Sequence, residues 1–332
     1  MTSRTRYFVI GSLLVLAAGV GTGLIAYYVG FPAGAFQRRG GPEELQYIPR
    51  DAAVIAYANV QEVMASELRQ KLHRALPMKE DGQREFQSHT GINIETDIDR
   101  VIACLNPDRS SSNLHGGGLV LARGRFDEVR IESLMRDHGA EVEQYRGKRL
   151  VVADLGDHPT SLAVAFIEPG LVGVGSASLV KSAVDLHQSG DNPQVGLQSV
   201  TGNEELMNLV RSLDSGNAWA VGRFDALTAR ARLPEGVASQ LPAITWFSVS
   251  GHINGGLRGI VRAETRDEEA ANNLRDVIRG FMALAKLQAG SRPEVQMMAQ
   301  SLELGGTGKT VALSFDVPAE VFDAISAAIP KH

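Results

Sequence analysis

A long uncharged run near the N-terminus is the first feature of the hydrophobic pattern. No charged residue occurs in residues 7–37, and the apolar centre of this run covers the 23 residues 7–29. At about 1.5 Å per residue such a helix is about 34 Å long, and the hydrocarbon core of a bilayer is roughly 30 Å thick. The pattern therefore predicts a single transmembrane helix at residues 7–29, after a short cytoplasmic tail at residues 1–6.

The same run has some features of a cleaved secretory signal. Arg4 and Arg6 precede it, and residues 33–35 (Ala-Gly-Ala) match a small-residue cleavage site. The apolar region of a signal is only roughly 7–15 residues long, so an uncleaved signal-anchor is favoured and cleavage after Ala35 is the alternative. The arginines beside the start of the run favour a cytoplasmic N-terminus. We therefore expect a single-pass protein of the inner (cytoplasmic) membrane, with its body facing the periplasm or cell exterior.

Beyond this run, a Gly- and Pro-rich linker is expected at residues 30–46. Strand-like and helix-like patterns then follow one another to the C-terminus. Strands are expected at residues 53–59, 118–123, 142–145, 150–154, 162–167, 171–175, 218–221, 244–253, 257–263, 295–304 and 310–317. Helices are expected at residues 60–76, 127–138, 177–188, 203–213, 267–288 and 319–329.

Turn residues and apolar spacing add detail to this pattern. The four short strands between residues 142 and 175 are separated by Gly, Asp and Pro, which is typical of an antiparallel meander. Residues 254–256 (Asn-Gly-Gly) predict a tight two-residue connection between two strands. In the helix at 267–288, one apolar stripe is formed by Leu274, Ile278, Phe281 and Ala285.

A repeated tetrapeptide indicates an internal duplication. Residues 124–127 and 222–225 both read Gly-Arg-Phe-Asp, and both stand where a strand is expected to end and a helix to begin. Aspartate is suited to the N-cap there, because its carboxylate accepts hydrogen bonds from free amides of the first turn. We therefore predict an α+β fold with two similar modules, at residues 47–190 and 191–332, each with antiparallel sheets and packed helices.

Composition excludes some classes of partner. The net charge is −5 and the pI about 5.9, with no clustered basic stripe, so we expect no nucleic-acid partner. The single cysteine, Cys104, stands among apolar residues and is interpreted as a small buried side chain.

Residues 305–310 (Gly-Gly-Thr-Gly-Lys-Thr) resemble the end of a phosphate-binding loop. The complete motif needs a glycine five residues before Gly308, where this chain has Glu303, and a helix after the loop. Residues 311–315 have a strand pattern instead. We therefore interpret the glycines as a hairpin turn and expect no nucleotide.

Other polar clusters also lack a complete catalytic or metal-binding pattern. Residues 115–118 (His-Gly-Gly-Gly) resemble an esterase oxyanion loop, but no G-x-S-x-G elbow accompanies them. Ser176 is interpreted as a helix N-cap. Residues 93–99 alternate like calcium ligands but lack the required Gly and Glu. The turn at residues 154–158 holds Asp154, Asp157 and His158 without a nucleophile beside them. Catalytic residues are therefore unknown, and no cofactor or metal ligand is predicted.

Three segments resemble a bacterial family of single-pass membrane-anchored envelope proteins of unknown function. They are residues 47–60 (beginning Tyr-Ile-Pro-Arg-Asp-Ala-Ala), residues 90–98 and residues 173–190. The resemblance covers residues 47–329 and implies one membrane helix and a duplicated α+β exterior. Residues 214–217 depart from it, because a Pro-x-Asp-Ala opening is expected there. It implies no catalytic residues.

These observations favour a membrane-anchored envelope protein with a non-catalytic binding or scaffolding body. Its partner would be an unknown envelope protein, lipid or polymer. One alternative is an extracytoplasmic hydrolase or lipid-handling enzyme, which would need a deep pocket with convergent titratable groups. The other is an anchored chaperone or assembly factor, which would need a large exposed apolar face.

Overall fold

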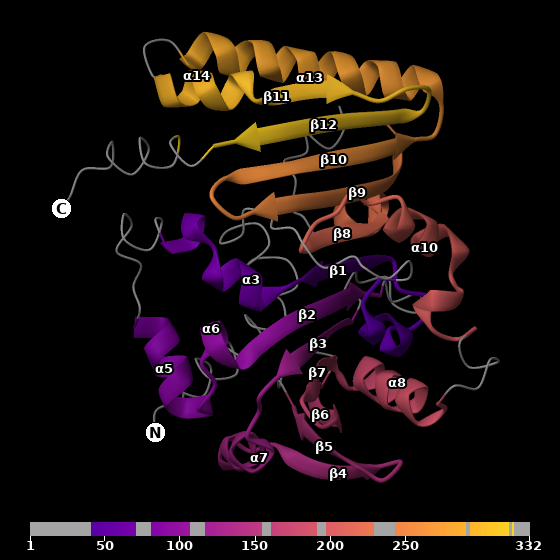
Figure 1. Cartoon of the computed structure of the whole chain (residues 1–332). Helices are drawn as coiled ribbons and strands as arrows, with labels where there is room; N and C mark the ends of the chain where they lie inside the picture. Colours follow the sequence, from indigo (N-terminus) through magenta and orange to yellow (C-terminus); the bar gives the residue numbers. More distant parts are fainter. Residues whose placement is uncertain are drawn as a thin grey trace. The chain divides into compact units, whose positions relative to one another are not determined.

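The computed structural model describes residues 41–70, 81–106, 117–154, 161–190, 197–228, 243–289, 293–318 and 321. The fold is mixed α+β, with extensive antiparallel sheet and several helices (Figure 1). The chain divides into two compact units, and the described residues of unit 1 lie within 41–61 and 81–211. Those of unit 2 lie within 62–70 and 212–321. Residues 197–211, which the sequence pattern assigned to the second module, thus belong to unit 1.

Unit 1 contains an antiparallel sheet in the order β1-β2-β3-β7-β6-β5-β4. The strands are β1 (Val54–Ala58), β2 (Ile98–Leu105), β3 (Gly118–Gly124), β4 (Glu141–Tyr145), β5 (Lys148–Ala153), β6 (Leu162–Glu168) and β7 (Leu171–Ser176). β4 to β7 pair in chain order, so the predicted meander is confirmed. Cys104 on β2 is 2% exposed, as its apolar setting indicated.

The helices of unit 1 cover this sheet and its ends. They are η2 (Glu43–Tyr47), α3 (Val60–Ala65, which continues into unit 2), α5 (Asp81–Thr90), α6 (Ile94–Asp97), α7 (Glu128–Asp137), α8 (Ala177–Gln188), η3 (Val200–Gly202) and α10 (Glu204–Arg211). α8 packs against β6, β7 and η2. Its core-facing side chains recur at helical spacing, and Val180, Ala183 and Val184 are fully buried.

Unit 2 contains a second antiparallel stretch of sheet, in the order β11-β12-β10-β9-β8. Its elements are β8 (Ala218–Arg223), α11 (Phe224–Thr228), β9 (Ile244–Ile253), β10 (Leu257–Thr265), α13 (Glu268–Ala289), α14 (Pro293–Gln300), β11 (Leu302–Gly305) and β12 (Thr310–Val317). α13 buries Ala271 and Leu274 against Val311 of β12. This small core holds α13 on one face of the sheet.

Two predicted elements of unit 2 differ from the structure. Residues 295–304 were expected to be one strand, but α14 occupies Pro293–Gln300 and only β11 is extended. Proline is well suited to the first turn of a helix, and the Met, Gln and Ala residues that follow are good helix formers. The β9–β10 connection consists of residues 254–256, so the predicted two-residue turn is wrong by one residue.

The predicted helix at residues 60–76 is interrupted. α3 ends at Ala65, and the Ser66 hydroxyl donates a hydrogen bond to the Val63 carbonyl at 2.7 Å. The same oxygen accepts a hydrogen bond from the Arg69 amide at 3.2 Å. Serine therefore caps a new turn here, as its short polar side chain favours.

The repeated tetrapeptide is used differently in the two units. Asp127 is the N-cap of α7, and its Oδ1 accepts a hydrogen bond from the Arg130 amide at 3.0 Å. Asp225 lies inside α11, where its Oδ1 accepts hydrogen bonds from the Ala226 amide and from the Arg223 side chain. The N-cap prediction is thus confirmed in the first copy and wrong in the second.

No helix among the described residues is both long and apolar enough to cross a bilayer. The expected transmembrane helix at residues 7–29 and the linker up to residue 40 lie outside the described residues. The same holds for the expected final helix at 319–329, apart from Val321, which is helical and buried.

Candidate functional site

Among the described residues of unit 1, the most deeply buried charged side chain is that of Glu44, in the turn η2. Leu45 of this turn is 1% exposed and is part of the hydrophobic core. Its amide donates a hydrogen bond to the Pro42 carbonyl at 3.2 Å, and the Ile48 amide donates to the Leu45 carbonyl at 3.1 Å. This tight geometry turns the Glu44 side chain inward, where it is 3% exposed.

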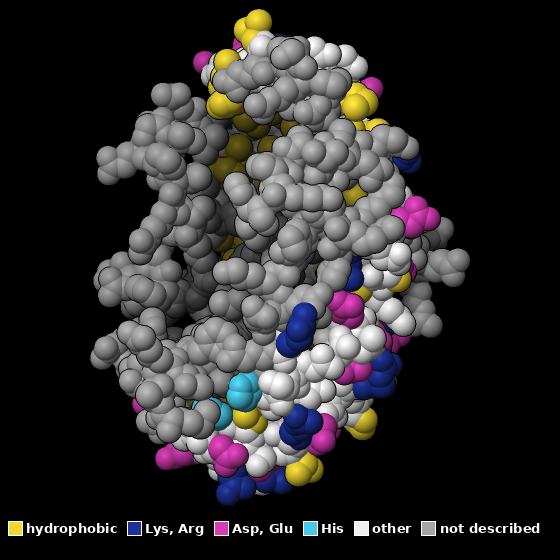
Figure 2. Space-filling model, turned by 90° about the vertical axis from the view of Figure 1, so that its left-hand side faces the viewer, with side chains coloured by type: hydrophobic (Ala, Val, Ile, Leu, Met, Phe, Trp, Pro, Cys, Tyr) yellow, Lys and Arg dark blue, Asp and Glu magenta, His cyan; other side chains and the backbone are white. Residues whose placement is uncertain are grey.

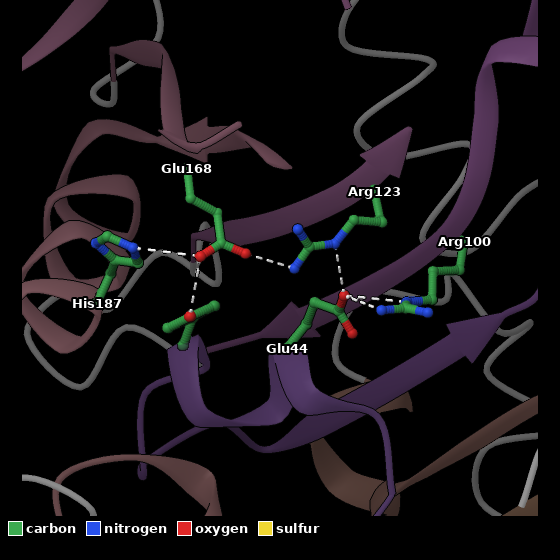
Figure 3. A network of polar contacts seen from close by, with 6 residues as sticks. Glu44, Arg100, Arg123, Glu168 and His187 are labelled. Atoms are coloured by element: carbon green, nitrogen blue, oxygen red, sulfur yellow. Dashed lines mark hydrogen bonds and ion pairs between the residues drawn. The ribbon is translucent and has the colours of Figure 1, made fainter. Parts of the chain in front are cut away.

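Two arginines from adjacent strands bind Glu44 (Figure 3). Arg100 of β2 and Arg123 of β3 are direct partners in the sheet register. The Nε atom of each arginine donates to Glu44 Oε1 at 3.0 Å, and Arg100 Nη2 lies 2.9 Å from the same oxygen. The other carboxylate oxygen, Oε2, is buried without a hydrogen-bond partner in the described part of the chain.

A second carboxylate continues the network. Arg123 Nη2 donates to Oε1 of Glu168, at the end of β6, at 2.6 Å. The Tyr47 hydroxyl donates to Glu168 Oε2 at 3.4 Å, and Nε2 of His187 on α8 lies 3.4 Å from the same oxygen. The Tyr47 and His187 rings are 5.4 Å apart, centroid to centroid. The network therefore connects η2, three strands and α8.

Ionisation of the network follows from its geometry. Burial raises the pKa of the Glu44 carboxyl, but the hydrogen bonds and charges of Arg100 and Arg123 outweigh burial and hold that pKa below its ordinary value. Burial alone would lower the pKa of Arg123, and Glu168 and Glu44 raise it instead. The pKa of Tyr47 is raised, first by burial and then by the Glu168 carboxylate. The network thus places two glutamates against two arginines.

This balanced arrangement fits an ion-pair clamp better than a ligand site. The positive charges of Arg100 and Arg123 are matched by Glu44 and Glu168, so the network offers no net charge to an ionic ligand. Its position at η2 fixes the first turn of the body to the sheet. Sequence reasoning missed the network because its ion pairs join residues 45 to 79 positions apart, and Glu44 lies in a polar stretch that resembled linker.

A groove of about 530 Å³ lies in unit 2, and two rows of side chains crossing the sheet line it. Ser250, Ile260, Ser314 and Glu303 form the first row, in register across β9, β10, β12 and β11. His252, Arg258 and Asp316 form the second row, two residues further along each strand. Residues two apart on a strand share a face, so both rows belong to one face of the sheet. The α13 core contacts, Ala263 and Val311, lie at positions of the opposite parity and therefore on the other face.

The groove combines glycine, hydroxyl and charged groups. Gly251 and Gly259, paired between the two rows, add no side-chain bulk. Ser250 is 2% exposed, and its hydroxyl has no hydrogen-bond partner in the described part of the chain. Arg258 Nη2 lies 2.8 Å from Asp316 Oδ2.

A second ion pair contributes to the edge of the groove. Asp214, which lines it, accepts a hydrogen bond from Arg262 Nη2 at 2.6 Å. The aspartate of each pair is more than half exposed, so solvent screens both pairs strongly. Serines in strands and exposed charges give no specific sequence signal, and only the strand register brings them together.

The motifs that the sequence analysis set aside have structural roles where they are described. Residues 306–309 form the β11–β12 turn, and Thr310 begins a strand, as the hairpin interpretation predicted. Asn93 caps α6 by accepting from the Glu95 amide at 3.0 Å, and Asp97 Oδ2 accepts from the Asn93 amide at 2.8 Å. Ser176 is the N-cap residue of α8, but its side chain makes no capping hydrogen bond.

The remaining polar clusters are only partly described. His115, Asp157 and His158 lie outside the described residues, and Asp154 is exposed. Within the described ranges, no group of three or more His, Cys, Asp or Glu side chains is placed to hold a metal ion.

No protein-family model matches the chain, and no curated protein matches it. Among solved structures, the chain is similar to one described as "Structure of crystal form I of TP0453". The two are 10% identical with a TM-score of 0.47, and the match covers 87% of this chain and 99% of that chain.

Proposed function

We propose that the protein is a membrane-anchored envelope protein whose body is a non-catalytic binding or scaffolding module. The observation that carries the proposal is the groove on the sheet of unit 2, with its two rows of hydroxyl and charged side chains. Its side chains come from four strands, so the sheet register holds them in place before a ligand binds. Such preorganisation lowers the entropy cost of binding.

The charges of the groove are suited to binding a polar ligand. Asp316 and Asp214 each form an ion pair with an arginine, and both aspartates are more than half exposed. Exposed pairs of this kind cost little to open, typically about 0–1 kcal/mol, so a polar ligand can replace either partner.

The anchoring part of the proposal rests on the uncharged run at residues 7–29. With its arginines on the N-terminal side, this run supports an inner-membrane location with the body in the periplasm or outside the cell. The resemblance to single-pass envelope proteins supports the same location.

The duplication also belongs to the proposal. In unit 1, the strand β3 is followed by helix α7 and the hairpin β4–β5; in unit 2, β8 is followed by α11 and the hairpin β9–β10. The Gly-Arg-Phe-Asp string stands at the strand–helix junction in both. We infer that the two units diverged from one ancestral module.

In-cell photo-crosslinking tests the binding proposal. A photoreactive amino acid is placed in the full-length chain at Glu303, which is exposed in the groove, and in a second chain at Val129, which is 80% exposed on α7. We expect discrete adducts from position 303 that are absent from position 129, identified by mass spectrometry after purification from membranes.

The variant Arg258→Glu supplies the specificity control. It removes a cationic donor from the groove, and losing a charged hydrogen bond should lower the adduct yield roughly tenfold. The Asp225→Asn variant, in the same unit but not among the residues that line the groove, should leave the yield unchanged. Equal labelling from positions 303 and 129, or a yield indifferent to Arg258→Glu, would refute groove binding.

A further inference from the structure

Helix α13 has buried apolar side chains in its first half and exposed ones in its second half. Its first half packs on the sheet, where Ala271 is fully buried and Leu274 is 6% exposed. The predicted stripe continues into the second half, but there Phe281 is 67% exposed. Leu287, which is outside the stripe, is 79% exposed. The stripe is therefore a core contact only as far as Ile278, which packs partly buried against that core.

The exposed apolar surface extends from α13 onto α14. Leu284 of α13 is 48% exposed, and Met297 and Met298 of α14 are 38% and 39% exposed. The two helices pack side by side (Figure 1). In Figure 2, separate groups of hydrophobic side chains, in yellow, are visible at the top of the view. Phe281, Leu284, Leu287, Met297 and Met298 are called the helical apolar patch below.

This patch is distinct from isolated surface hydrophobics. Eight large hydrophobic side chains are exposed in the described part of the chain, and five of them belong to the patch. The other three, Val129, Leu197 and Val261, are on separate elements. Single exposed hydrophobics are normal in soluble proteins, whereas five on two helices that pack together indicate an interaction surface.

The charge pattern favours a lipid surface as the partner. From Gly280 to Ala289 the only charged residue is Lys286, so the exposed half of α13 is apolar with one cationic side chain. A lysine on an interfacial helix extends its ammonium to the headgroups while its stem and the neighbouring Phe and Leu side chains lie among acyl chains. Anionic lipids add electrostatic attraction for such a side chain.

The proposed anchor would keep the whole chain, including unit 2, on one bilayer. The 13 residues from 30 to 42 separate the expected membrane helix from η2. Fully extended, they reach at most about 3.6 Å each, or about 47 Å in total. Tethering makes binding to the same membrane an intramolecular step. The effective concentration of lipid is then high, so even a weakly binding apolar surface is expected to be bound for much of the time.

We propose that the helical apolar patch docks on the surface of the bilayer that anchors the protein, with Phe281, Leu284 and Leu287 among the acyl chains. This inference rests on the anchoring part of the proposed function. It adds a second membrane contact, made by unit 2 itself.

Site-specific fluorescence in vesicles tests this docking. Full-length chains with Leu287→Cys or Val129→Cys are labelled with an environment-sensitive fluorophore; the native Cys104 is 2% exposed and does not compete for label. Each chain is reconstituted into vesicles of three parts phosphatidylglycerol to seven parts phosphatidylethanolamine. At position 287 we expect blue-shifted emission and a roughly twofold loss of intensity to lipid-borne quenchers, because an interfacial helix lies within the acyl boundary. Position 129 should show neither effect.

Two further experiments distinguish lipid docking from contact with protein and test the anchor separately. Adding Lys286→Glu to the Leu287→Cys chain should weaken quenching in the anionic vesicles but not in vesicles of phosphatidylcholine. A blue shift without lipid quenching would mean that a second copy of the chain covers the patch, and it would overturn the proposal. Equal signals at positions 287 and 129 would overturn it too. An alkaline carbonate wash reports on the anchor separately: quenching at 287 in a chain that the wash removes would preserve docking and refute the anchor.

Discussion

Individual residues determine how the first turn of the body is held. Glu44 is buried and charged, and only the two arginines on β2 and β3 make this tolerable. A buried charge without a partner is strongly destabilising, whereas a neutral replacement of the whole network can be harmless. Arg123 touches both carboxylates and is therefore the member whose removal has the largest effect.

Arg123→Met should lower the free energy of unfolding by roughly 2–3 kcal/mol at pH 7, somewhat less than for a fully buried pair because Arg123 is 21% exposed. The measurement is urea unfolding of the full-length chain in detergent. Arg258→Met, which removes only the exposed pair with Asp316, should change stability by about 0–1 kcal/mol.

The pH dependence of this difference has a definite sign. Because the folded pKa of Glu44 is below its ordinary value of 4.5, its ion pairs stabilise the protein above that value and lose this effect as the pH falls through the folded pKa. The gap between wild type and Arg123→Met should therefore narrow in acid. A constant gap would mean that the loss comes from packing and not from charge.

Elements in unit 2 depend on close backbone approach as well as on hydrophobic pattern. Gly259, in the middle of β10, pairs with Gly251 on one side and Phe315 on the other. A Cβ atom placed on Gly259 would lie 2.6 Å from Phe315 Cζ and 2.8 Å from the Ser250 carbonyl oxygen. The Phe315 side chain can rotate away from such a Cβ atom, but the Ser250 carbonyl oxygen cannot, because it is part of the sheet backbone.

Gly259→Ala should therefore destabilise the protein by about 1–3 kcal/mol, the usual cost of overpacking. Gly305→Ala is the matched control, because Gly305 is also in a strand and a Cβ atom there meets nothing within 4 Å. Thermal unfolding of both variants provides the comparison. Equal melting temperatures would show that β10 and β12 move apart without cost.

At the scale of the whole molecule, the proposed location in the cell rests on the predicted membrane helix. If residues 7–29 span the bilayer, the full-length chain should stay with membranes through an alkaline carbonate wash, and external protease should digest the body once the outer barrier is opened. Leu16→Arg together with Val20→Arg places two charges near the centre of the span, each costing about 2.5–3.5 kcal/mol there. This double variant should appear in the supernatant, whereas Leu16→Ile with Val20→Leu should not.

Much of the secondary structure could be predicted because its signals are local. The meander β4–β7 and helix α8 follow from alternating or helical spacing and from turn glycines, including Gly147 and Gly170, which have positive φ angles of 75°. α14 was missed because a short apolar run fits either a strand or a helix when its packing is unknown. Ser66 was missed because one serine rarely ends a helix.

The sequence by itself determined the α+β class, the order of most elements and the structural meaning of residues 305–310, because these depend on neighbours in the chain. Only the tertiary structure decided that Glu44 meets Arg123, that two rows of polar side chains share a groove, and that Phe281 is exposed while Leu274 is buried. The physical reason is that burial and ion pairing depend on which distant residues fold against a side chain. A stripe on a helix shows which side chains share a face, but not how far along that face the sheet extends.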